Sequence, residues 1–500
     1  LSVELAAQPQ DETPERWYAS GQAELQRMLS QQPNTARARN IILFVGDGMG
    51  ISTVTAARIH AGQKQGMSGE ENSLSFERFP ALALSKTYNT NQQTPDSAGT
   101  MTAMMTGVKT SAGVIAINQH ARRADCASAQ GQELPTFLQQ AEARGLATGI
   151  VTTTRITHAT PAATFAHTPE RDWEGDINLS AEARANGCQD IASQLIDFNY
   201  GDGLEVAMGG GRQFFIPETA NDPHNGRPGT RQDGRNLVAE WTAQAPGSEF
   251  VWNREQLAAL DIANTRHLLG LFNRSHMSYR ADREQSQTSE PDLPQMTETA
   301  IRLLQKNQQG FFLMVEAGRI DHAHHAGNAY RALEDAAELS AAVTLATQLT
   351  SSEDTLIIVT ADHSHTFTIA GYPTRGNPIL GKVVNNDEHG EAETEPALAE
   401  DNSPYTTLSY NNGRGFAENL GGDRRYTQPA DAGRHDLSDV DTEDGDYHQE
   451  VLIPLEMGTH AGEDVAIYAQ GPWAHLFSGT HEQNYIYHVM RHAAGWPGTD

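Results

Sequence analysis

The chain has 500 residues, a mean hydropathy of -0.54 and a formal net charge of -29, from 64 acidic residues against 35 lysines and arginines. This length supports one large core, and no change in composition divides the chain, so one large α/β domain with insertions is expected. No apolar run approaches the roughly 18 residues of a membrane helix, and the negative charge repels nucleic acids and anionic membranes, so neither is an expected partner.

The cysteine and lysine contents are both unusual. Cys126 and Cys188 are the only cysteines, too few for a thiolate metal cluster and the right number for one disulfide, with two buried free thiols as the alternative. Nearly all basic residues are arginines, a balance that resembles proteins of salt-loving organisms. Residues 1–5 have neither a basic nor an apolar signal region, so a signal peptide is either absent or already removed.

The predicted elements alternate between helix and strand along most of the chain. Residues 14–32 carry apolar side chains at helical spacing and predict an N-terminal helix, and residues 134–144 predict a helix that leads into a strand over 147–153. Between 371 and 455 the composition changes to Gly, Pro, Asn and acidic residues, which predicts a surface insertion. A late strand over 464–469 then rejoins the sheet.

Three short apolar runs end in residues that bind metals. The runs 41–45, 311–315 and 355–360 precede Asp47, Glu316 and Asp362-His363. Such runs are typical of buried parallel strands, whose carboxyl ends meet at one edge of the sheet. The sequence therefore predicts one polynuclear metal site at that edge.

Histidines near these carboxylates are further candidate ligands. Asp321 and His325 are four residues apart, so a helical turn places them on one face, although a histidine-rich turn is also common on a solvated surface. Asp362 and His363 offer the carboxylate and imidazole mixture that suits zinc, with a helix N-cap beside a core histidine as the alternative. His460 precedes the late strand and by itself could be any loop histidine.

Two further residues suit an anionic substrate. Residues 94–101 open a predicted helix whose N-terminus favours anions, and Ser97 stands there. Two nearby zinc ions would turn this serine into a nucleophile, whereas the ordinary role of a serine at this place is an N-cap. Arg171 can clamp two phosphate oxygens, with a surface salt bridge as the alternative.

Taken together, the motifs resemble the alkaline phosphatase family over roughly residues 40–490. They are Gly46-Asp47-Gly48-Met49-Gly50, Pro95-Asp96-Ser97-Ala98-Gly99, Val315-Glu316, Asp321-His322-Ala323-His324-His325, Ala361-Asp362-His363-Ser364-His365 and Thr459-His460-Ala461-Gly462-Glu463-Asp464. The resemblance is closest to the animal-type branch, because His158 and His322 stand where the enterobacterial branch has Asp and Lys. It implies a three-layer α/β/α sandwich with a large, mostly parallel central sheet, a helical arm over 1–39 and a catalytic domain over 40–500 with a crown-like insertion at about 372–456.

The resemblance also implies an active site with two zinc ions and one magnesium ion per subunit. The implied ligands are Asp321, His325 and His460 for the first zinc, Asp47, Asp362 and His363 for the second, and Asp47, Thr160 and Glu316 for magnesium. Ser97 is implied as the nucleophile and Arg171 as the phosphate clamp, with Asp96, His158 and His322 beside the phosphate. The additional calcium site of the animal enzymes is not expected here, because His224 and Asn273 occupy two of its carboxylate positions while Glu290 matches.

The function implied is a periplasmic or secreted phosphomonoesterase that acts through a phosphoserine intermediate. Its partners are phosphomonoesters and inorganic phosphate, the expected assembly is a homodimer, and the resemblance implies a Cys126–Cys188 disulfide. A phosphodiesterase or sulfatase on the same fold is one alternative, but residues 96–100 lack the sulfatase Cys/Ser-x-Pro-x-Arg motif. An exported metal-dependent phosphate-binding protein without turnover is the other.

Overall fold

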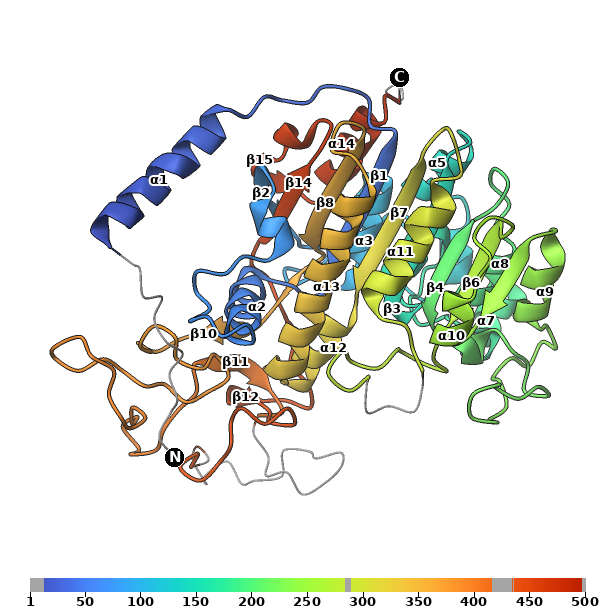
Figure 1. Cartoon of the computed structure of the whole chain (residues 1–500). Helices are drawn as coiled ribbons and strands as arrows, with labels where there is room; N and C mark the ends of the chain where they lie inside the picture. The colour runs from blue at the N-terminus through green and yellow to red at the C-terminus, as the bar shows by residue number, and fades with distance from the viewer. Residues whose placement is uncertain (1–12, 284–288, 416–433, 435, 497–500) are drawn as a thin grey trace.

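The computed structural model describes residues 13–283, 289–415, 434 and 436–496. A ten-stranded sheet in the order β15-β2-β14-β8-β1-β7-β3-β4-β6-β5 forms its centre (Figure 1). The strands are β1 (Asn40–Gly46), β2 (Ala81–Lys86), β3 (Ala147–Arg155), β4 (Val206–Gly210), β5 (Ser248–Val251), β6 (His267–Leu271), β7 (Phe311–Ala317), β8 (Thr355–Ala361), β14 (Val465–Gln470) and β15 (Ser478–Glu482). Only β14 runs antiparallel to its neighbours, β2 and β8. The predicted strands at 41–45, 147–153, 311–315, 355–360 and 464–469 are therefore confirmed.

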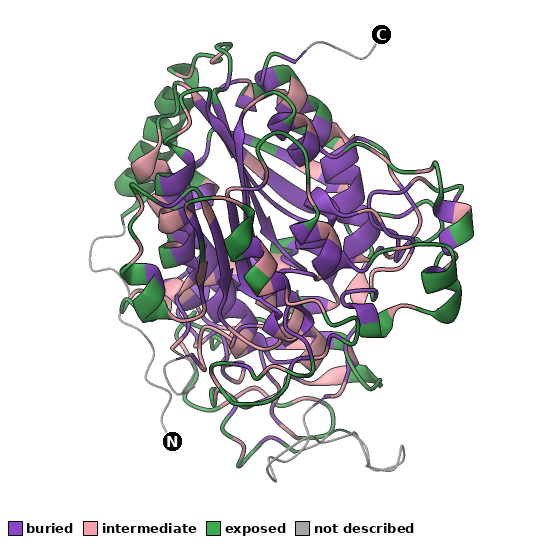
Figure 2. Cartoon of the chain, turned by 90° about the vertical axis from the view of Figure 1, so that its right-hand side faces the viewer, coloured by how far each residue is buried: buried purple, intermediate pink, exposed green. Residues whose placement is uncertain are grey.

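Helices cover both faces of this sheet and leave its strands buried (Figure 2). One layer contains α2 (Ile51–Gln63), α10 (Arg254–Ala258), α11 (Leu293–Leu304), α12 (Arg319–Ala326) and α13 (Ala329–Leu349). The other contains α3 (Ser97–Thr106), α5 (Phe137–Glu142), α6 (Ala159–Phe165), α8 (Ile191–Ile196), α9 (Leu237–Gln244) and α14 (Tyr485–Ala493). Side chains of β1 alternate between the layers: Ile41, Leu43 and Val45 join one core, and Ile42 and Phe44 the other. The predicted three-layer α/β/α fold is confirmed.

A smaller sheet stands beside the carboxyl edge of the large one. It consists of β10 (Phe367–Ile369), β11 (Leu408–Gly413) and β12 (Val451–Pro454), and β9 (Ser364–His365) pairs separately with β13 (His460–Ala461). Most of it belongs to the stretch that the composition predicts to be an insertion, of which residues 416–433 and 435 lie outside the described residues. Nδ1 of His448, within this stretch, donates to the carbonyl oxygen of Ala326 at 2.6 Å. This segment therefore contacts helix α12 directly.

The predicted N-terminal helix is α1 (Pro14–Leu29), and Figure 1 shows it standing away from the rest of the molecule. None of its residues is buried. The preceding residues, 1–12, lie outside the described part of the chain. No helix among the described residues combines the length and apolarity that crossing a bilayer requires.

Two short helices, α4 (Cys126–Ala129) and α7 (Ala181–Ala185), lie near the only two cysteines. Cys126 and Cys188 form a disulfide with a Cα–Cα distance of 6.0 Å. The implied pairing is therefore confirmed, and the alternative of two free thiols is wrong.

Candidate metal centre

The strand register brings three carboxylates to one edge of the sheet. β1 lies between β7 and β8, and Val45 is opposite both Glu316 and Thr360. Asp47 and Asp362 each follow the last residue of their strands, whose ends are paired through Gly46 and Ala361. Asp47, Glu316 and Asp362 are all completely buried. The predicted convergence of these carboxylates is therefore present.

The buried oxygen atoms at this edge lack hydrogen-bond partners. Both carboxylate oxygens of Asp47, Oε1 of Glu316 and the hydroxyl of Thr160 have none. Burial, followed by the charges of Asp362, Asp321 and Glu316, raises the pKa of Asp47 well above its usual range, and burial raises the pKa of Glu316 to about 7. Buried carboxylates without donors are costly unless cations neutralise them. The site therefore fits bound metal ions.

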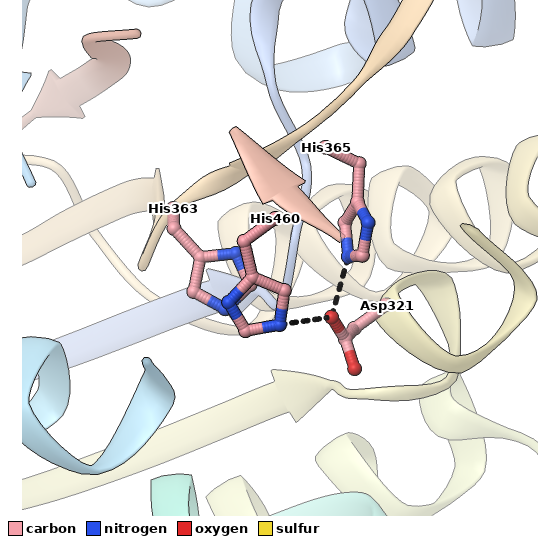
Figure 3. A group of neighbouring side chains, drawn as sticks. All are labelled: Asp321, His363, His365 and His460. Carbon is pink, nitrogen blue, oxygen red and sulfur yellow. Dashed lines mark hydrogen bonds and ion pairs between the residues drawn. The ribbon is translucent and has the colours of Figure 1, made fainter. Parts of the chain in front are cut away.

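Among the described residues, atoms that can coordinate a metal form three overlapping groups, each with its atoms within 4.8 Å of one another. The groups are Asp47–Asp362–His363, Asp47–His158–Glu316 and Asp321–His363–His365–His460. Figure 3 shows the side chains of the last group directed toward one another. The first group is the set that the resemblance implies for the second zinc.

The residues implied for the first zinc also come together. Oδ1 of Asp321 lies 3.3 Å from Nε2 of His325 and 3.4 Å from Nε2 of His460. Asp321 is nearly buried, at 4% exposure, so the alternative of a solvated surface turn is wrong for it. The two imidazole Nε2 atoms lie 3.0 Å apart, a separation that a shared cation would bridge.

Backbone carbonyl groups orient the imidazoles. Nδ1 of His325 donates to the carbonyl of Gly458 at 2.5 Å, and Nδ1 of His460 donates to that of Pro95 at 2.7 Å. Nδ1 of His363 donates likewise to the Ser364 carbonyl, at 3.2 Å. With Nδ1 protonated, each Nε2 carries a free lone pair and faces the carboxylates, which is how metal-binding histidines are commonly held.

Ser97 is the first residue of α3, and its hydroxyl lies at the metal groups. Oγ of Ser97 is 3.2 Å from Nε2 of His363. The N-cap of α3 is Asp96, whose side chain accepts from the backbone N–H of Gly99 at 3.2 Å. The alternative in which Ser97 serves as the cap is therefore wrong. Met101, Met104 and Met105 of the same helix are completely buried in the core.

Arg171 lies beside Ser97 and is held by two neighbours. Its Nη1 donates to Oδ2 of Asp96 at 3.1 Å, and its Nη2 donates to Nε2 of His158 at 3.3 Å. Burial opposes the charge of Arg171, but Asp96, Asp47 and Asp172 together outweigh burial and raise the pKa of the guanidinium. Arg171 therefore stays charged, and its salt bridge with Asp96 is mostly covered, with side-chain exposures of 18% and 17%.

The residues expected around the third metal and the phosphate are also present. His158 is the N-cap of α6, Thr160 lies in its first turn, and the His158 and His322 rings are 5.4 Å apart. Nη1 of Arg319 donates to Nδ1 of His322 at 3.0 Å, which fixes the orientation of that ring. His158 belongs to the group with Asp47 and Glu316, so it can act as a ligand itself.

Two site histidines were not predicted as site residues. His365 lies 2.5 Å from Oδ1 of Asp321, and it could have been found because it alternates with His363 along an extended segment and so shares its face. The ring of His276 lies 4.2 Å from that of His322 and 5.3 Å from that of His158. His276 belongs to none of the sequence motifs, so nothing in the sequence marked it.

At the position that matches the calcium site of the animal enzymes, the Glu290 carboxylate accepts hydrogen bonds from protein donors. The side chain of Glu290 accepts from Nδ2 of Asn273 at 2.6 Å and from the backbone N–H of Ser278 at 2.8 Å. His224 instead packs its ring 6.1 Å from that of Trp252. Among the described residues, no group of three potential ligands includes Glu290.

Comparison with known proteins places the chain in a family. The model of the family described as alkaline phosphatase matches residues 38–496. The chain belongs to the alkaline phosphatase family. It is 46% identical over 492 residues to the tissue-nonspecific alkaline phosphatase of Gallus gallus, covering 97% of this chain and 90% of that one, and 45% identical over 493 residues to the one of Homo sapiens, covering 97% and 89%.

A solved structure agrees with this assignment. The alkaline phosphatase of Thermus thermophilus superposes with a TM-score of 0.65 at 27% identity, and the match covers 94% of each chain. Alkaline phosphatases are metal-dependent phosphomonoesterases, and the three ligand groups of this chain are consistent with that chemistry.

Proposed function

We propose that this chain is an alkaline phosphatase that hydrolyses phosphate monoesters to an alcohol and inorganic phosphate through a phosphoserine at Ser97. The observation that carries the proposal is the position of the Ser97 hydroxyl, 3.2 Å from His363 within a buried group of carboxylates and imidazoles. Arg171 lies on the same side of the site, held by Asp96 and His158. A nucleophile, an anion clamp and metal ligands in one site match the needs of phosphoryl transfer.

The metal ions proposed are two zinc ions and one magnesium ion. Asp321, His325 and His460 would hold one zinc, and Asp47, Asp362 and His363 the other, because both sets mix imidazole with carboxylate. Asp47, Thr160 and Glu316 offer oxygen atoms only, as magnesium prefers. When bound, such ions lower the pKa of a nearby hydroxyl and stabilise charge on the leaving oxygen.

The side chains of the protein supply position and orientation. The Ser97 oxygen attacks phosphorus in line with the ester oxygen, the P–O bond to the alcohol breaks, and the alcohol leaves with a proton. Arg171 binds two equatorial phosphate oxygens, and its bond to Asp96 fixes the plane of the guanidinium. Water then attacks the phosphoserine, which releases phosphate and restores the serine. His158 and His322, whose rings lie 5.4 Å apart, would lie beside the phosphate, as in the animal-type branch.

Hydrolysis of a chromogenic phosphomonoester, measured before and after chelation on samples of known metal content, tests the proposal. Activity should disappear with the metal and return when zinc and magnesium are added back. Binding of phosphate without turnover by the metal-loaded protein would instead indicate a phosphate-binding protein. A phosphodiester and a sulfate ester measured in parallel should be much poorer substrates, because the single phosphate clamp is built for a monoester dianion.

We also infer that the protein is a homodimer and that the helical arm at 1–39 extends from a catalytic domain at 40–500. Within the arm, Trp17, Tyr18 and Leu29 of α1 are 58%, 70% and 65% exposed. The crown-like insertion at about 372–456 likewise exposes Leu452, at 79%. Large apolar side chains at these exposures favour burial against a second subunit. Light scattering should give twice the chain mass, and deletion of 1–39 should weaken the dimer; a monomer at assay concentrations contradicts this inference.

We propose that the protein is periplasmic or secreted. Its support is the disulfide between Cys126 and Cys188, since such bonds form and persist in oxidising compartments. The acidic, lysine-poor composition supports the further proposal that the enzyme is adapted to high salt. Fractionation of the source cells, with activity found outside the cytoplasm, tests the location.

A further inference from the structure

Three threonines in succession, Thr152, Thr153 and Thr154, end the buried part of β3 beside the metal centre. Alternate residues of a strand share a face, so Thr152 and Thr154 lie on the same side of β3. Thr152 is also directly opposite Glu316 of β7 in the parallel register. The sequence of β3 therefore presents two hydroxyl groups to the carboxylate of Glu316.

Both hydroxyl groups act on the same oxygen of that carboxylate. The Thr152 hydroxyl donates to Oε2 of Glu316, and the backbone N–H of Thr154 donates in turn to Oγ1 of Thr152 at 2.8 Å. The Thr154 hydroxyl lies 3.1 Å from Oε2 and 2.8 Å from Oγ1 of Thr152, so it bonds either to Glu316 or to the hydroxyl that does. Oε1 of Glu316 has no hydrogen-bond partner. The protein thus occupies one oxygen of Glu316 and leaves the other available.

Close packing fixes the side chains of both threonines. Thr152, Thr154 and Glu316 are completely buried. A Cβ atom on Gly209 of β4 would lie 2.7 Å from Cγ2 of Thr152, and one on Gly318 would lie 2.2 Å from Cγ2 of Thr154. The threonine methyl groups therefore fill the space beside these two glycines. Since the methyl group and the hydroxyl share one χ1 angle, this packing also holds the hydroxyls toward Glu316.

The other carboxylates of the metal centre show a related pattern. Asp47, which is proposed to bind both zinc and magnesium, has no partner on either oxygen. Asp362, which is proposed to bind one zinc only, has Oδ1 occupied by the backbone N–H groups of Gly48 and His363, at 3.0 and 2.8 Å. Its Oδ2 lies 3.1 Å from Nε2 of His363, the other proposed ligand. Hydrogen bonds thus hold back one oxygen of each carboxylate assigned to a single metal ion, Glu316 included.

We propose that Thr152, supported by Thr154, is a positioning residue that reserves Oε1 of Glu316 for the third metal ion and favours magnesium there over calcium. The inference rests on the proposed function, in which Asp47, Thr160 and Glu316 bind magnesium. Magnesium demands near-octahedral coordination, whereas calcium accepts about six to eight oxygens and often takes both oxygens of one carboxylate. With Oε2 held by a threonine hydroxyl, Glu316 offers one oxygen only, which suits the smaller ion.

Magnesium titration of the zinc-loaded, magnesium-free enzyme tests the proposal. Thr152→Val keeps the branched shape of the side chain and removes the hydroxyl. Calorimetry should show magnesium binding weakened by about tenfold or more, with the zinc content of the wild type. The magnesium concentration that gives half-maximal activity should rise in parallel. Calcium binding should weaken less, because the released Oε2 lets Glu316 bind the larger ion through both oxygens, so the ratio of magnesium to calcium affinity should fall.

Three further variants separate this role from a contribution to packing. Thr152→Ser keeps the hydroxyl without the methyl group, so it should retain the magnesium affinity of the wild type even if its Tm is lower. Thr154→Val should cause a smaller loss of affinity than Thr152→Val, since Thr152 still binds Oε2. The matched control is Thr297→Val on α11, which removes a buried hydroxyl that donates to the Leu293 carbonyl at 2.8 Å. It should leave magnesium affinity unchanged.

The outcomes distinguish this inference from the proposed metal site. Equal magnesium affinity in the wild type and Thr152→Val, or an equal loss in Thr152→Ser and Thr152→Val, would overturn the inference and leave the proposed magnesium site intact. An equal loss of magnesium and calcium affinity in Thr152→Val would overturn the role in selectivity. A wild-type enzyme that binds zinc but no magnesium would contradict the proposed metal set, and this inference with it.

Discussion

Oγ of Ser97 lies 3.2 Å from Nε2 of His363, which joins the first residue of α3 to the end of β8. Two independent backbone arrangements produce this contact: a helix that is capped by Asp96 and a strand that ends at Ala361. Since Asp96 satisfies the helix N-terminus, the Ser97 hydroxyl is left available for chemistry. The residue is thus placed by the fold without contributing to the core.

Arg171→Ala should raise KM for a phosphomonoester and weaken inhibition by inorganic phosphate, each by about tenfold or more. The reason is that two charge-assisted hydrogen bonds to the phosphate are lost. Steady-state kinetics with and without added phosphate would measure both effects. The matched control is Arg123→Ala, since Arg123 is 47% exposed and pairs with Glu170. Equal KM values for the two variants would contradict the assignment of Arg171 as the clamp.

Asp335→Asn should stabilise the protein increasingly as the pH rises. Burial raises the pKa of Asp335 to about 7 from 3.8, and its Oδ1 has no partner. A carboxyl with a raised pKa keeps its proton in the folded state. The wild type therefore loses stability as the pH rises from the pKa of this carboxyl in the unfolded chain to its folded-state pKa of about 7. Asparagine does not titrate and avoids this loss.

Thermal unfolding of the Asp335→Asn variant and the wild type between about pH 5 and pH 8 would measure this difference. The gap in Tm should widen up to about pH 7 and then stay constant. Asp439→Asn, at an exposed position in the insertion, should follow the wild type throughout. A gap of constant size across the range would show that Asp335 is already ionised in the folded protein.

The disulfide should contribute roughly 4 kcal/mol to stability on the chain-entropy model, because it closes a loop between residues 62 apart. A double variant with serine at Cys126 and Cys188 should therefore unfold at a clearly lower temperature. Thiol titration of the denatured, unreduced wild type should find no free thiol. Two free thiols per chain would refute the bond and weaken the proposed export.

Salt should stabilise the protein and preserve its activity well above physiological concentrations. A net charge of -29 repels itself, and salt shortens the range of that repulsion to about 3 Å at 1 M. Tm and activity should be followed over a sodium chloride series, with sucrose as a neutral osmolyte control. A steady decline of both from low salt upward would rule out salt adaptation.

Much of the fold and site could be predicted because the signals are local. The runs 41–45, 311–315 and 355–360 are strands that end at candidate metal ligands, and parallel strands bring such ends to one edge. The order of the strands and the antiparallel direction of β14 depend on tertiary contacts that periodicity does not encode.

Residues that reach the site from other segments could not be found in the same way. His276 approaches His322 only through the folded chain, and no motif precedes it. The cap of α3 was ambiguous because Asp96 and Ser97 are both good N-cap residues, and only the hydrogen bond from Gly99 to Asp96 distinguishes them.

Trapping the covalent intermediate tests the central claim most directly. The metal-loaded enzyme is mixed with a phosphomonoester, quenched in acid within the first turnovers, digested and examined by mass spectrometry. The proposed mechanism predicts one phosphate on the peptide that contains Ser97. The Ser97→Ala variant should carry no phosphate on this peptide and should keep only residual turnover. Its folding and zinc content should match those of the wild type. Wild-type turnover in Ser97→Ala, or full activity with no phosphate on Ser97, would contradict it.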